Sequence, residues 1–271
     1  MLNHPTGRPT TALPASGGIL MSETATGQLA ASGQSLVYHE GGIDFSGQIV
    51  MPNGTVSGGL IYVPDWYGIY DYPLAEARRF ASLGFAVMVV DIYGAGVRIT
   101  SDAEATQASQ FLRDNPRTAS RRVQAGVRAF RDIVPEAPFL AAVGFSLGGF
   151  CVLEMLTDAP LVHGAVILSG ALGQPDGDYA AIETPIRFHH GTRDAVADVA
   201  RVTKVMAWLD AKGCDCALTL YAGAKHAFTN PNLPSGGDGW LGYDARYAGE
   251  ANAATESFLL SLKGNTGALA A

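Results

Sequence analysis

One stretch of sequence decides the fold of this chain: Phe139-Leu140-Ala141-Ala142-Val143-Gly144-Phe145-Ser146-Leu147-Gly148-Gly149. Its first five residues are apolar and have the length of a buried strand, and the residues after Gly149 have a helical pattern. The pattern Gly-x-Ser-x-Gly between a strand and a helix is typical of a nucleophile elbow, in which a strained turn exposes the serine hydroxyl. A side chain at Gly144 or Gly148 would crowd such a turn. The stretch therefore predicts Ser146 as a nucleophile, with an ordinary glycine-rich turn as the alternative.

A serine nucleophile needs a base, and the base needs an acid that orients it. In this architecture the order along the chain is serine, acid, histidine. The apolar segment 186–190 runs into a loop that contains Asp194, and the segment 218–222 runs into a loop that contains His226. Since the carboxyl ends of parallel strands share one edge of a sheet, these residues can meet there. We predict that Ser146, Asp194 and His226 form a catalytic triad.

Both partners of the serine have rivals in the sequence. The other histidines are His4, His39, His163, His189 and His190. The rival acids are Asp198, which follows Asp194, and Asp176 and Asp178, which are in another loop. Asp198 is a strong rival because it comes four residues after Asp194, one turn into the following helix. Asp194 is preferred because it lies in the first turn after the strand.

Five motifs, in order along the chain, resemble the dienelactone hydrolase family. They are Val63-Pro64-Asp65-Trp66-Tyr67-Gly68, 83–94, 144–149, 190–194 and 221–228. The resemblance runs from about Tyr38 to Leu262 and implies an α/β-hydrolase fold with acyl chemistry. The backbone N–H of Leu147, which follows the nucleophile, is one expected oxyanion donor. The resemblance implies the N–H of Trp66 as the second donor.

The chain departs from this family at two places. Namesake members usually carry cysteine at the position of Ser146, and they hold a substrate carboxylate with arginines that the stretches 94–96 and 229–232 lack. Arg98 is close to the first stretch but displaced from it. We therefore expect neutral esters with small or medium acyl groups as substrates. Dienelactone-type lactone hydrolysis, an acyltransferase or peptidase on the same triad, and a non-catalytic binding protein remain alternatives.

Aromatic residues and one acid near predicted strand ends are candidates for the substrate pocket. They are Asp65, Tyr67, Tyr93, Phe145, Phe228 and Trp240. Aromatic side chains are equally common in protein cores, so each of these rings has a core position as its alternative. For Asp65 the alternative to a role in the pocket is a carboxylate that caps its own loop.

The composition is typical of a globular enzyme. Of the 271 residues, 48% are hydrophobic and 16% are charged, and the net charge of −7 disfavours nucleic acid and anionic membranes as partners. No apolar run is long enough for a transmembrane helix. The three cysteines do not make a disulfide framework, and the Cys214-Asp215-Cys216 stretch has no second pair of metal ligands. We expect no metal, no cofactor and a cytoplasmic location, and the oligomeric state is left open.

The chain is expected to hold one domain between two loose ends. Residues 1–33 are rich in Thr, Ala, Gly, Ser and Pro without hydrophobic periodicity, and 264–271 are similar, so both are predicted tails around a domain at 34–263. Predicted strands are 35–40, 43–51, 59–63, 85–90, 139–143, 161–169, 185–190 and 216–222. Predicted helices are 73–83, two segments within 102–133 broken at Asn115-Pro116, then 146–157, 196–211 and one within 243–262. This alternation predicts an α/β fold with a mainly parallel sheet and helices on both faces.

Overall fold

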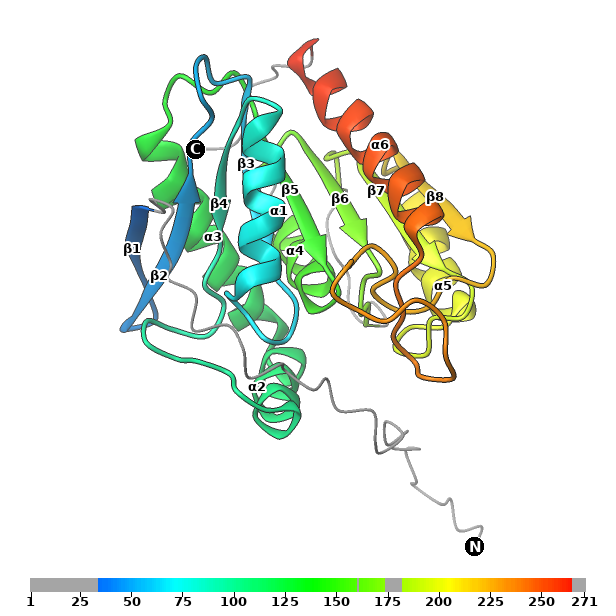
Figure 1. The fold of residues 1–271 in the computed structure, drawn as a ribbon. Helices are drawn as coiled ribbons and strands as arrows, with labels where there is room; N and C mark the ends of the chain where they lie inside the picture. The colour runs from blue at the N-terminus through cyan, green and yellow to red at the C-terminus, as the bar shows by residue number, and fades with distance from the viewer. Residues whose placement is uncertain (1–33, 160, 174–181, 265–271) are drawn as a thin grey trace, which may run out of the picture.

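The structure, a computed structural model, describes residues 34–159, 161–173 and 182–264. These residues contain one eight-stranded sheet with the order β1-β2-β4-β3-β5-β6-β7-β8 (Figure 1). The strands are Gln34–Glu40 (β1), Ile43–Val50 (β2), Gly58–Val63 (β3), Phe85–Val89 (β4), Leu140–Phe145 (β5), Gly164–Leu168 (β6), Ile186–Gly191 (β7) and Cys216–Tyr221 (β8). The pairs β1–β2 and β2–β4 are antiparallel, and all others are parallel. The predicted α/β-hydrolase fold with a mainly parallel sheet is confirmed.

Helices cover both faces of this sheet. They are Asp71–Ser82 (α1), Asp102–Asp114 (α2), Pro116–Ile133 (α3), Leu147–Asp158 (α4), Val199–Ala211 (α5) and Ala245–Ser261 (α6), followed by the short 3₁₀ helix Leu262–Gly264 (η1). Figure 1 shows α1 and α6 on one face and α3, α4 and α5 on the other. Helix α2 lies apart from both layers, beyond the edge at which β5 and β6 end. It is therefore close to the edge where the candidate residues are expected.

The central strand β3 illustrates how the core is divided between the two faces. Its six residues are all buried. Leu60 and Tyr62 belong to the apolar cluster on the α1–α6 side, whereas Ile61 and Val63 belong to the cluster on the α3–α4 side. Since alternate side chains point to opposite faces and both faces are covered, the strand is a continuous apolar run.

The turn after β5 is tighter than predicted. The predicted strand 139–143 continues to Phe145, which pairs with Leu168 of β6. The backbone N–H of Ser146 also donates to the carbonyl of Leu168 at 3.0 Å, and α4 begins at Leu147. Ser146 is thus the single residue between the strand and the helix.

Two other predicted elements begin later than expected. The backbone N–H of Leu161 donates to the carbonyl of Ala159 at 2.9 Å, and the strand predicted over 161–169 begins at Gly164. The helix predicted over 196–211 begins at Val199. Asp198 is its N-cap, since its carboxylate accepts the N–H of Arg201 at 2.7 Å. The predicted break at Asn115-Pro116 is confirmed, because α2 ends at Asp114 and α3 starts at Pro116.

The predicted tail 1–33 lies outside the described residues. So does the tail 264–271, apart from Gly264, which ends η1. The domain predicted between these tails, 34–263, contains all eight strands of the sheet.

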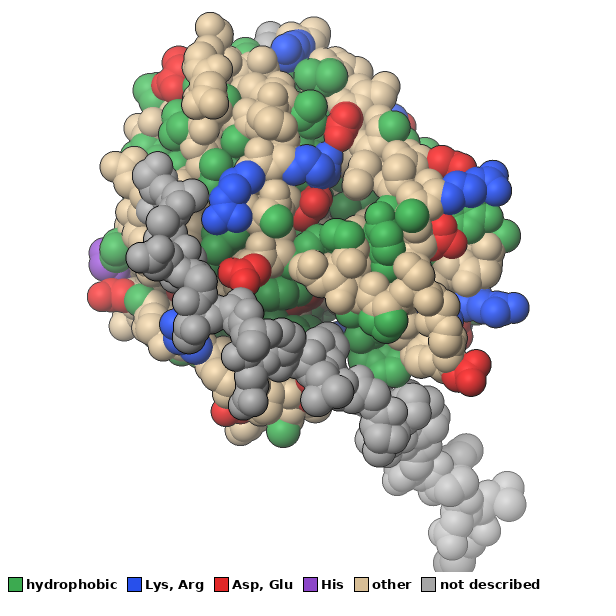
Figure 2. All heavy atoms as spheres, viewed as in Figure 1, with side chains coloured by type: hydrophobic (Ala, Val, Ile, Leu, Met, Phe, Trp, Pro, Cys, Tyr) green, Lys and Arg blue, Asp and Glu red, His purple; other side chains and the backbone are tan. Residues whose placement is uncertain are grey.

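Charged side chains of both signs share the face that carries α1 and α6 (Figure 2). Arg79 of α1 donates to Glu76 at 2.9 Å and to Glu256 of α6 at 2.5 Å. This arginine, which is partly covered, has carboxylate partners on its own helix and on the neighbouring one.

Candidate active site

Ser146 has a backbone conformation that few residues adopt. Its φ is 53° and its ψ is −113°, in a region that is strained for residues other than glycine. A Cβ on Gly144 would lie 2.6 Å from the carbonyl oxygen of Gly148, and a Cβ on Gly148 would overlap the carbonyl oxygen of Val63. Both glycines are therefore required by the close approach of the backbone, as the sequence predicts.

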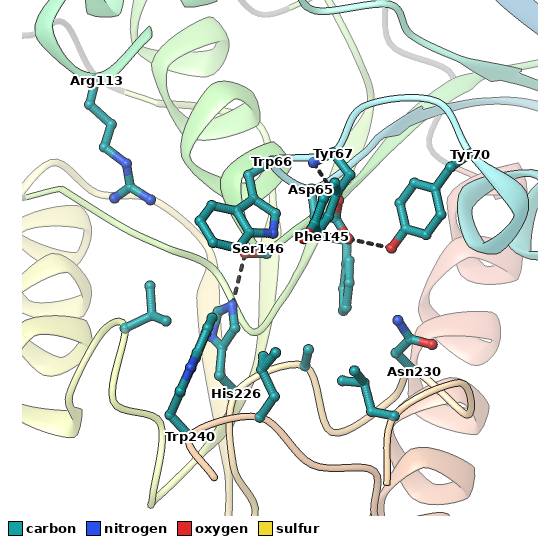
Figure 3. A pocket seen from close by; sticks show the side chains of 14 residues that line it. Asp65, Trp66, Tyr67, Tyr70, Arg113, Phe145, Ser146, His226, Asn230 and Trp240 are labelled. Atoms are coloured by element: carbon teal, nitrogen blue, oxygen red, sulfur yellow. Dashed lines mark hydrogen bonds between the residues drawn. The ribbon is translucent and has the colours of Figure 1, made fainter. Parts of the chain in front are cut away.

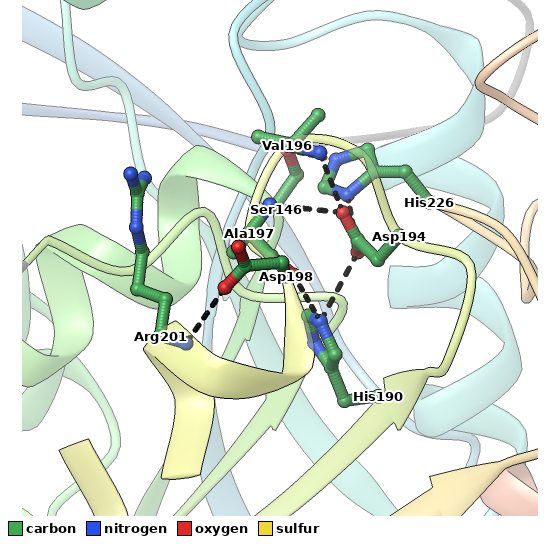
Figure 4. A network of polar contacts seen from close by, with 8 residues as sticks. All are labelled: Ser146, His190, Asp194, Val196, Ala197, Asp198, Arg201 and His226. Carbon is green, nitrogen blue, oxygen red and sulfur yellow. Dashed lines mark hydrogen bonds and ion pairs between the residues drawn. The ribbon is translucent and has the colours of Figure 1, made fainter. Parts of the chain in front are cut away.

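The loops after β5, β7 and β8 bring the three predicted residues together (Figure 4). Ser146 Oγ lies 2.8 Å from His226 Nε2, and His226 Nδ1 lies 2.7 Å from Asp194 Oδ2. All three side chains are buried. A carboxylate accepts hydrogen bonds, so we assign the imidazole proton to Nδ1, which leaves Nε2 free to accept the serine hydroxyl. The chain of contacts is the arrangement that activates a serine nucleophile.

Asp194 is held as a carboxylate by its surroundings. Its Oδ1 accepts the backbone N–H groups of Val196 at 2.8 Å and Ala197 at 3.0 Å. Burial alone would raise its pKa, but the neighbouring His226, followed by His190 and the Ala197 N–H, outweighs burial and holds the pKa of Asp194 below its ordinary value. The ionised acid therefore has one oxygen fixed by the backbone and the other directed at His226.

His190 is a second histidine next to this acid. Its Nε2 donates to the carbonyl of Ala197 at 2.7 Å and lies 3.5 Å from Asp194 Oδ2. Burial lowers the pKa of His190 below the usual range, so the ring is neutral and its one proton is used on Ala197. It supports the loop that carries Asp194.

The remaining rivals lie elsewhere or have other partners. His189 lies 2.9 Å from the hydroxyl of Tyr221, and burial lowers its pKa to about 4. His39 is exposed beside Asp44, and Asp198 caps α5. His163 immediately precedes β6. His4, Asp176 and Asp178 lie outside the described residues.

The two predicted oxyanion donors lie at the ends of neighbouring strands. Leu147 is the first residue of α4, and Trp66 is in the loop after β3. The peptide unit that follows Trp66 is held at both ends: its carbonyl accepts the hydroxyl of Tyr93 at 2.7 Å, and its N–H, from Tyr67, donates to Asp65 Oδ1 at 2.9 Å. This double attachment fixes the backbone next to the Trp66 N–H.

A pocket opens above Ser146 (Figure 3). It is lined by Asp65, Trp66, Tyr67, Tyr70, Arg113, Phe145, Ser146, Val196, His226, Ala227, Asn230, Leu233, Trp240 and Leu241. Four of the six predicted pocket residues are among them, namely Asp65, Tyr67, Phe145 and Trp240. The ring of Trp240 lies 6.0 Å from that of His226 and 6.2 Å from that of Trp66, so aromatic surface flanks the nucleophile.

Two predicted pocket residues do not line it. Phe228 is fully buried and packs against Tyr221, with ring centroids 4.9 Å apart. The hydroxyl of Tyr93 is bound to the Trp66 carbonyl, so Tyr93 supports the pocket wall without being part of it. A position near a strand end places a residue in the region of the pocket, but it does not determine the direction of its side chain.

Asp65 both caps its loop and lines the pocket. Besides the Tyr67 N–H, its carboxylate accepts the hydroxyl of Tyr70 at 2.8 Å. Burial raises the pKa of Asp65 to about 6, although both hydrogen bonds and His226 act in the opposite direction. The acid is therefore poised to lose its proton just below neutral pH.

Several residues that line the pocket were not predicted from the sequence, and Arg113 is the charged one among them. It comes from the last turn of α2 and points toward the pocket from the side opposite to Tyr70 and Asn230 (Figure 3). The other end of α2 contacts the pocket wall as well, because the hydroxyl of Tyr67 bonds to Asp102. No sequence motif marks Arg113, since its place depends on how α2 packs across the strand ends.

The part of the chain that the structure describes was searched for metal-binding clusters and for membrane-spanning helices. Within 34–159, 161–173 and 182–264, no group of three or more His, Cys, Asp or Glu side chains is arranged to hold a metal ion. In the same ranges, no helix has the length and apolar character needed to cross a membrane.

The fold and the strained serine elbow define an α/β-hydrolase. The family model described as "Dienelactone hydrolase family" matches residues 45–262, so the chain belongs to this family of hydrolases. The family resemblance predicted from the five motifs is confirmed. A search of curated proteins found no match.

Solved structures with this fold include several hydrolases. A dienelactone hydrolase-like promiscuous phosphotriesterase, P91, from metagenomic libraries has 25% identity and a TM-score of 0.78, and the match covers 85% of this chain and 97% of that one. The esterase Est2 of the Planctomycetes species Thermogutta terrifontis has 16% identity and a TM-score of 0.57, with coverage of 85% and 92%. An acylaminoacyl peptidase from Pyrococcus horikoshii has 12% identity and a TM-score of 0.61, with coverage of 85% and 41%. The latter two comparisons concern the fold alone.

Proposed function

We propose that this chain is a serine hydrolase of carboxylic esters, with Ser146 as nucleophile, His226 as general base and Asp194 as the acid that orients it. The observation that carries the proposal is the continuous contact from Ser146 Oγ through His226 to Asp194, at 2.8 and 2.7 Å, on the wall of a pocket. A strained serine that contacts a histidine with an ionised partner is the general arrangement for acyl transfer.

The proposed reaction forms and then breaks an acyl-enzyme. Nε2 of His226 removes the hydroxyl proton as Ser146 Oγ attacks the ester carbonyl carbon, and the same proton then passes to the departing alcohol. His226 next takes a proton from water, whose oxygen attacks the acyl carbon, and Ser146 recovers its proton as the acid leaves. Asp194 stabilises the imidazolium in both halves of the reaction.

The developing oxyanion is proposed to accept the N–H groups of Trp66 and Leu147. The peptide unit after Trp66 is held by Tyr93 and Asp65, which supports a donor that is in place before the substrate arrives. Preorganised donors lower the barrier because they need no rearrangement at the moment of reaction.

The substrate pocket suits an apolar body next to the reacting carbonyl. The rings of Trp66, Phe145 and Trp240 line it, and burying apolar area on them contributes roughly 25 cal/mol per Å². The expected preference for neutral esters assumed a pocket without a cation. That assumption is wrong, because Arg113 lines the pocket.

Covalent labelling and turnover test this proposal. The protein is treated with a fluorophosphonate probe and assayed on p-nitrophenyl esters of graded acyl length, beside Ser146→Ala and Ser169→Ala. Ser169 is a matched control, since it is buried, has a φ of 47° and directly follows the neighbouring strand β6. Label on Ser146 and turnover lost only in Ser146→Ala support the proposal, whereas label on another residue contradicts it.

Transfer to other acceptors is the second candidate, because an acyl-enzyme on this triad can also be attacked by an alcohol or formed from a peptide. The P91 comparison adds phosphotriesters, since that protein is described as a phosphotriesterase. Product analysis with and without an alcohol acceptor, together with a peptide and a phosphotriester substrate, separates these reactions from ester hydrolysis.

We also propose a cytoplasmic location. The three cysteines are free thiols, the state that a reducing compartment maintains. Fractionation of the native cells, followed by detection of the protein, tests this.

A further inference from the structure

Arg113 differs in its partners from three other arginines that are covered by the protein, Arg79, Arg122 and Arg187. Arg79 and Arg187 each reach a carboxylate at 3.0 Å or less. Arg122 is buried, donates to the carbonyl of Ile92 at 2.7 Å and has Asp91 nearby as a counter-charge. Arg113 makes one hydrogen bond among the described residues, from Nη1 to the carbonyl of Ala171 at 3.5 Å, a distance at which such a bond is weak.

The electrostatic surroundings of Arg113 contain a second cation. Burial first, and then repulsion by Arg201 of α5, lowers the pKa of the Arg113 guanidinium below its ordinary value. No carboxylate among the described residues acts in the opposite direction. The guanidinium stays charged at neutral pH, so it is a poorly solvated cation at the edge of the pocket, without a carboxylate partner among residues 34–159, 161–173 and 182–264.

A covered charge without a partner is costly, and a ligand of opposite charge removes that cost. Within the part of the chain that the structure describes, one of the five guanidinium N–H groups of Arg113 has a hydrogen-bond partner. The planar donor set matches a carboxylate, which can accept two parallel hydrogen bonds. The side chain faces the same pocket as Ser146, so the anion and the reacting ester can belong to one molecule.

We infer that Arg113 binds a carboxylate carried by one arm of the ester substrate, with Arg201 strengthening the positive potential at that end of the pocket. This inference rests on the proposed esterase function and specifies its substrate class. The recognising cation comes from α2, and not from the stretches 94–96 and 229–232, where the family resemblance would place it.

Matched pairs of esters test the inference on each arm. For the acyl arm they are mono-p-nitrophenyl glutarate and its methyl ester. For the alcohol arm they are 4-carboxyphenyl butyrate and its methyl ester. Because the carboxylate is on one arm of the substrate, the effect is expected in one of the two pairs. In that pair, Arg113→Gln should lower kcat/KM for the anionic ester by about ten- to a hundredfold, the range for a hydrogen bond between charged groups. It should change kcat/KM for the neutral ester by less than about threefold.

Three further variants separate charge at the pocket from charge elsewhere. Arg113→Lys keeps the charge, so it is expected to lower kcat/KM for the anionic ester less than Arg113→Gln does. Arg201→Gln is also expected to lower it less than Arg113→Gln does, because Arg201 is exposed. Arg98→Gln is the control. Arg98 is also an exposed arginine, but it does not line the pocket, so both members of each pair should be unaffected.

A binding measurement makes the subsite testable apart from catalysis. Glutarate is titrated by calorimetry into Ser146→Ala and into Ser146→Ala/Arg113→Gln, and weaker binding to the double variant by about tenfold or more is expected. Wild-type protein that hydrolyses no ester, with this binding difference intact, would refute the proposed function and leave the subsite standing. Equal effects of Arg113→Gln on anionic and neutral esters, or equal glutarate binding, would overturn the subsite while the esterase stands.

Discussion

The two charged groups that face the pocket differ in how completely the protein satisfies them. Asp65 has a donor on each oxygen, the Tyr67 N–H at 2.9 Å and the Tyr70 hydroxyl at 2.8 Å. Arg113, on the opposite side of Ser146, makes one long hydrogen bond to a carbonyl among the described residues. A satisfied group fixes the structure around it, whereas an unsatisfied one retains its bonding capacity for a ligand. The Asp65 end therefore builds the site, and the Arg113 end is available to select what enters it.

The chemistry is expected to take place at Ser146, between the Asp65 end and the Arg113 end of the pocket, and Ser146→Ala tests this with the largest expected effect. Removal of the attacking atom from a triad costs about 10⁶ in turnover. We expect a loss of that order in kcat on any ester that wild type accepts, with an unchanged circular dichroism spectrum. Activity above one tenth of wild type would place the reaction at another residue.

The second largest effect is expected for a change at Asp194, the acid that orients the base. Asp194→Asn should lower kcat by about 10⁴, because an amide no longer stabilises the imidazolium and presents a donor as well as an acceptor to Nδ1. Asp198→Asn is the matched control, since asparagine can replace aspartate as the N-cap of α5. Steady-state kinetics on both variants measures the two kcat values. A larger loss of kcat in Asp198→Asn than in Asp194→Asn would make Asp198 the triad acid.

The Asp65 end can be tested through the pH dependence of stability. The pKa of this acid is raised by burial to about 6 from an ordinary value of 3.8, so between these values the folded state binds more protons than the unfolded state. Stability from this group is therefore present at low pH and lost as pH rises through about 6. Relative to Asp65→Asn, the wild-type free energy of unfolding should fall by up to about 3 kcal/mol between pH 4 and pH 7.

Urea denaturation at several pH values measures this difference. Asp132→Asn, a change at an exposed site on α3, serves as the control for a hydrated carboxylate and should change little relative to wild type. A wild-type minus Asp65→Asn difference that is constant from pH 4 to pH 7 would contradict the assignment of a raised pKa to Asp65.

The smallest expected effect concerns the loop that Asp65 and Tyr93 hold together. Tyr93→Phe removes the hydroxyl that binds the Trp66 carbonyl at 2.7 Å, and we expect kcat to fall about three- to tenfold with little change in KM, the effect of one lost hydrogen bond on the oxyanion donor. Tyr38→Phe is the matched control, because the hydroxyl of Tyr38 donates to the carbonyl of Asp91, away from the pocket. A change in KM alone would mean that Tyr93 acts on substrate binding instead.

The sequence by itself identified the elements of the fold and the three residues that meet at its edge. Local hydrophobic periodicity predicts buried strands and amphipathic helices. The elbow needs glycine at positions such as Gly144 for steric reasons, and these depend on a few neighbouring residues. The order of the motifs then brings Ser146, Asp194 and His226 to one edge, because parallel strands end on the same side.

Only the tertiary structure decided which side chains face the pocket. Phe228 and Trp240 both follow β8, yet Phe228 packs against Tyr221 and Trp240 lies beside His226. Arg113 reaches the site because α2 crosses the strand ends, with Asp102 bonded to Tyr67 and Leu112 buried. Such directions depend on contacts between segments far apart in the chain, and local periodicity carries no information about them.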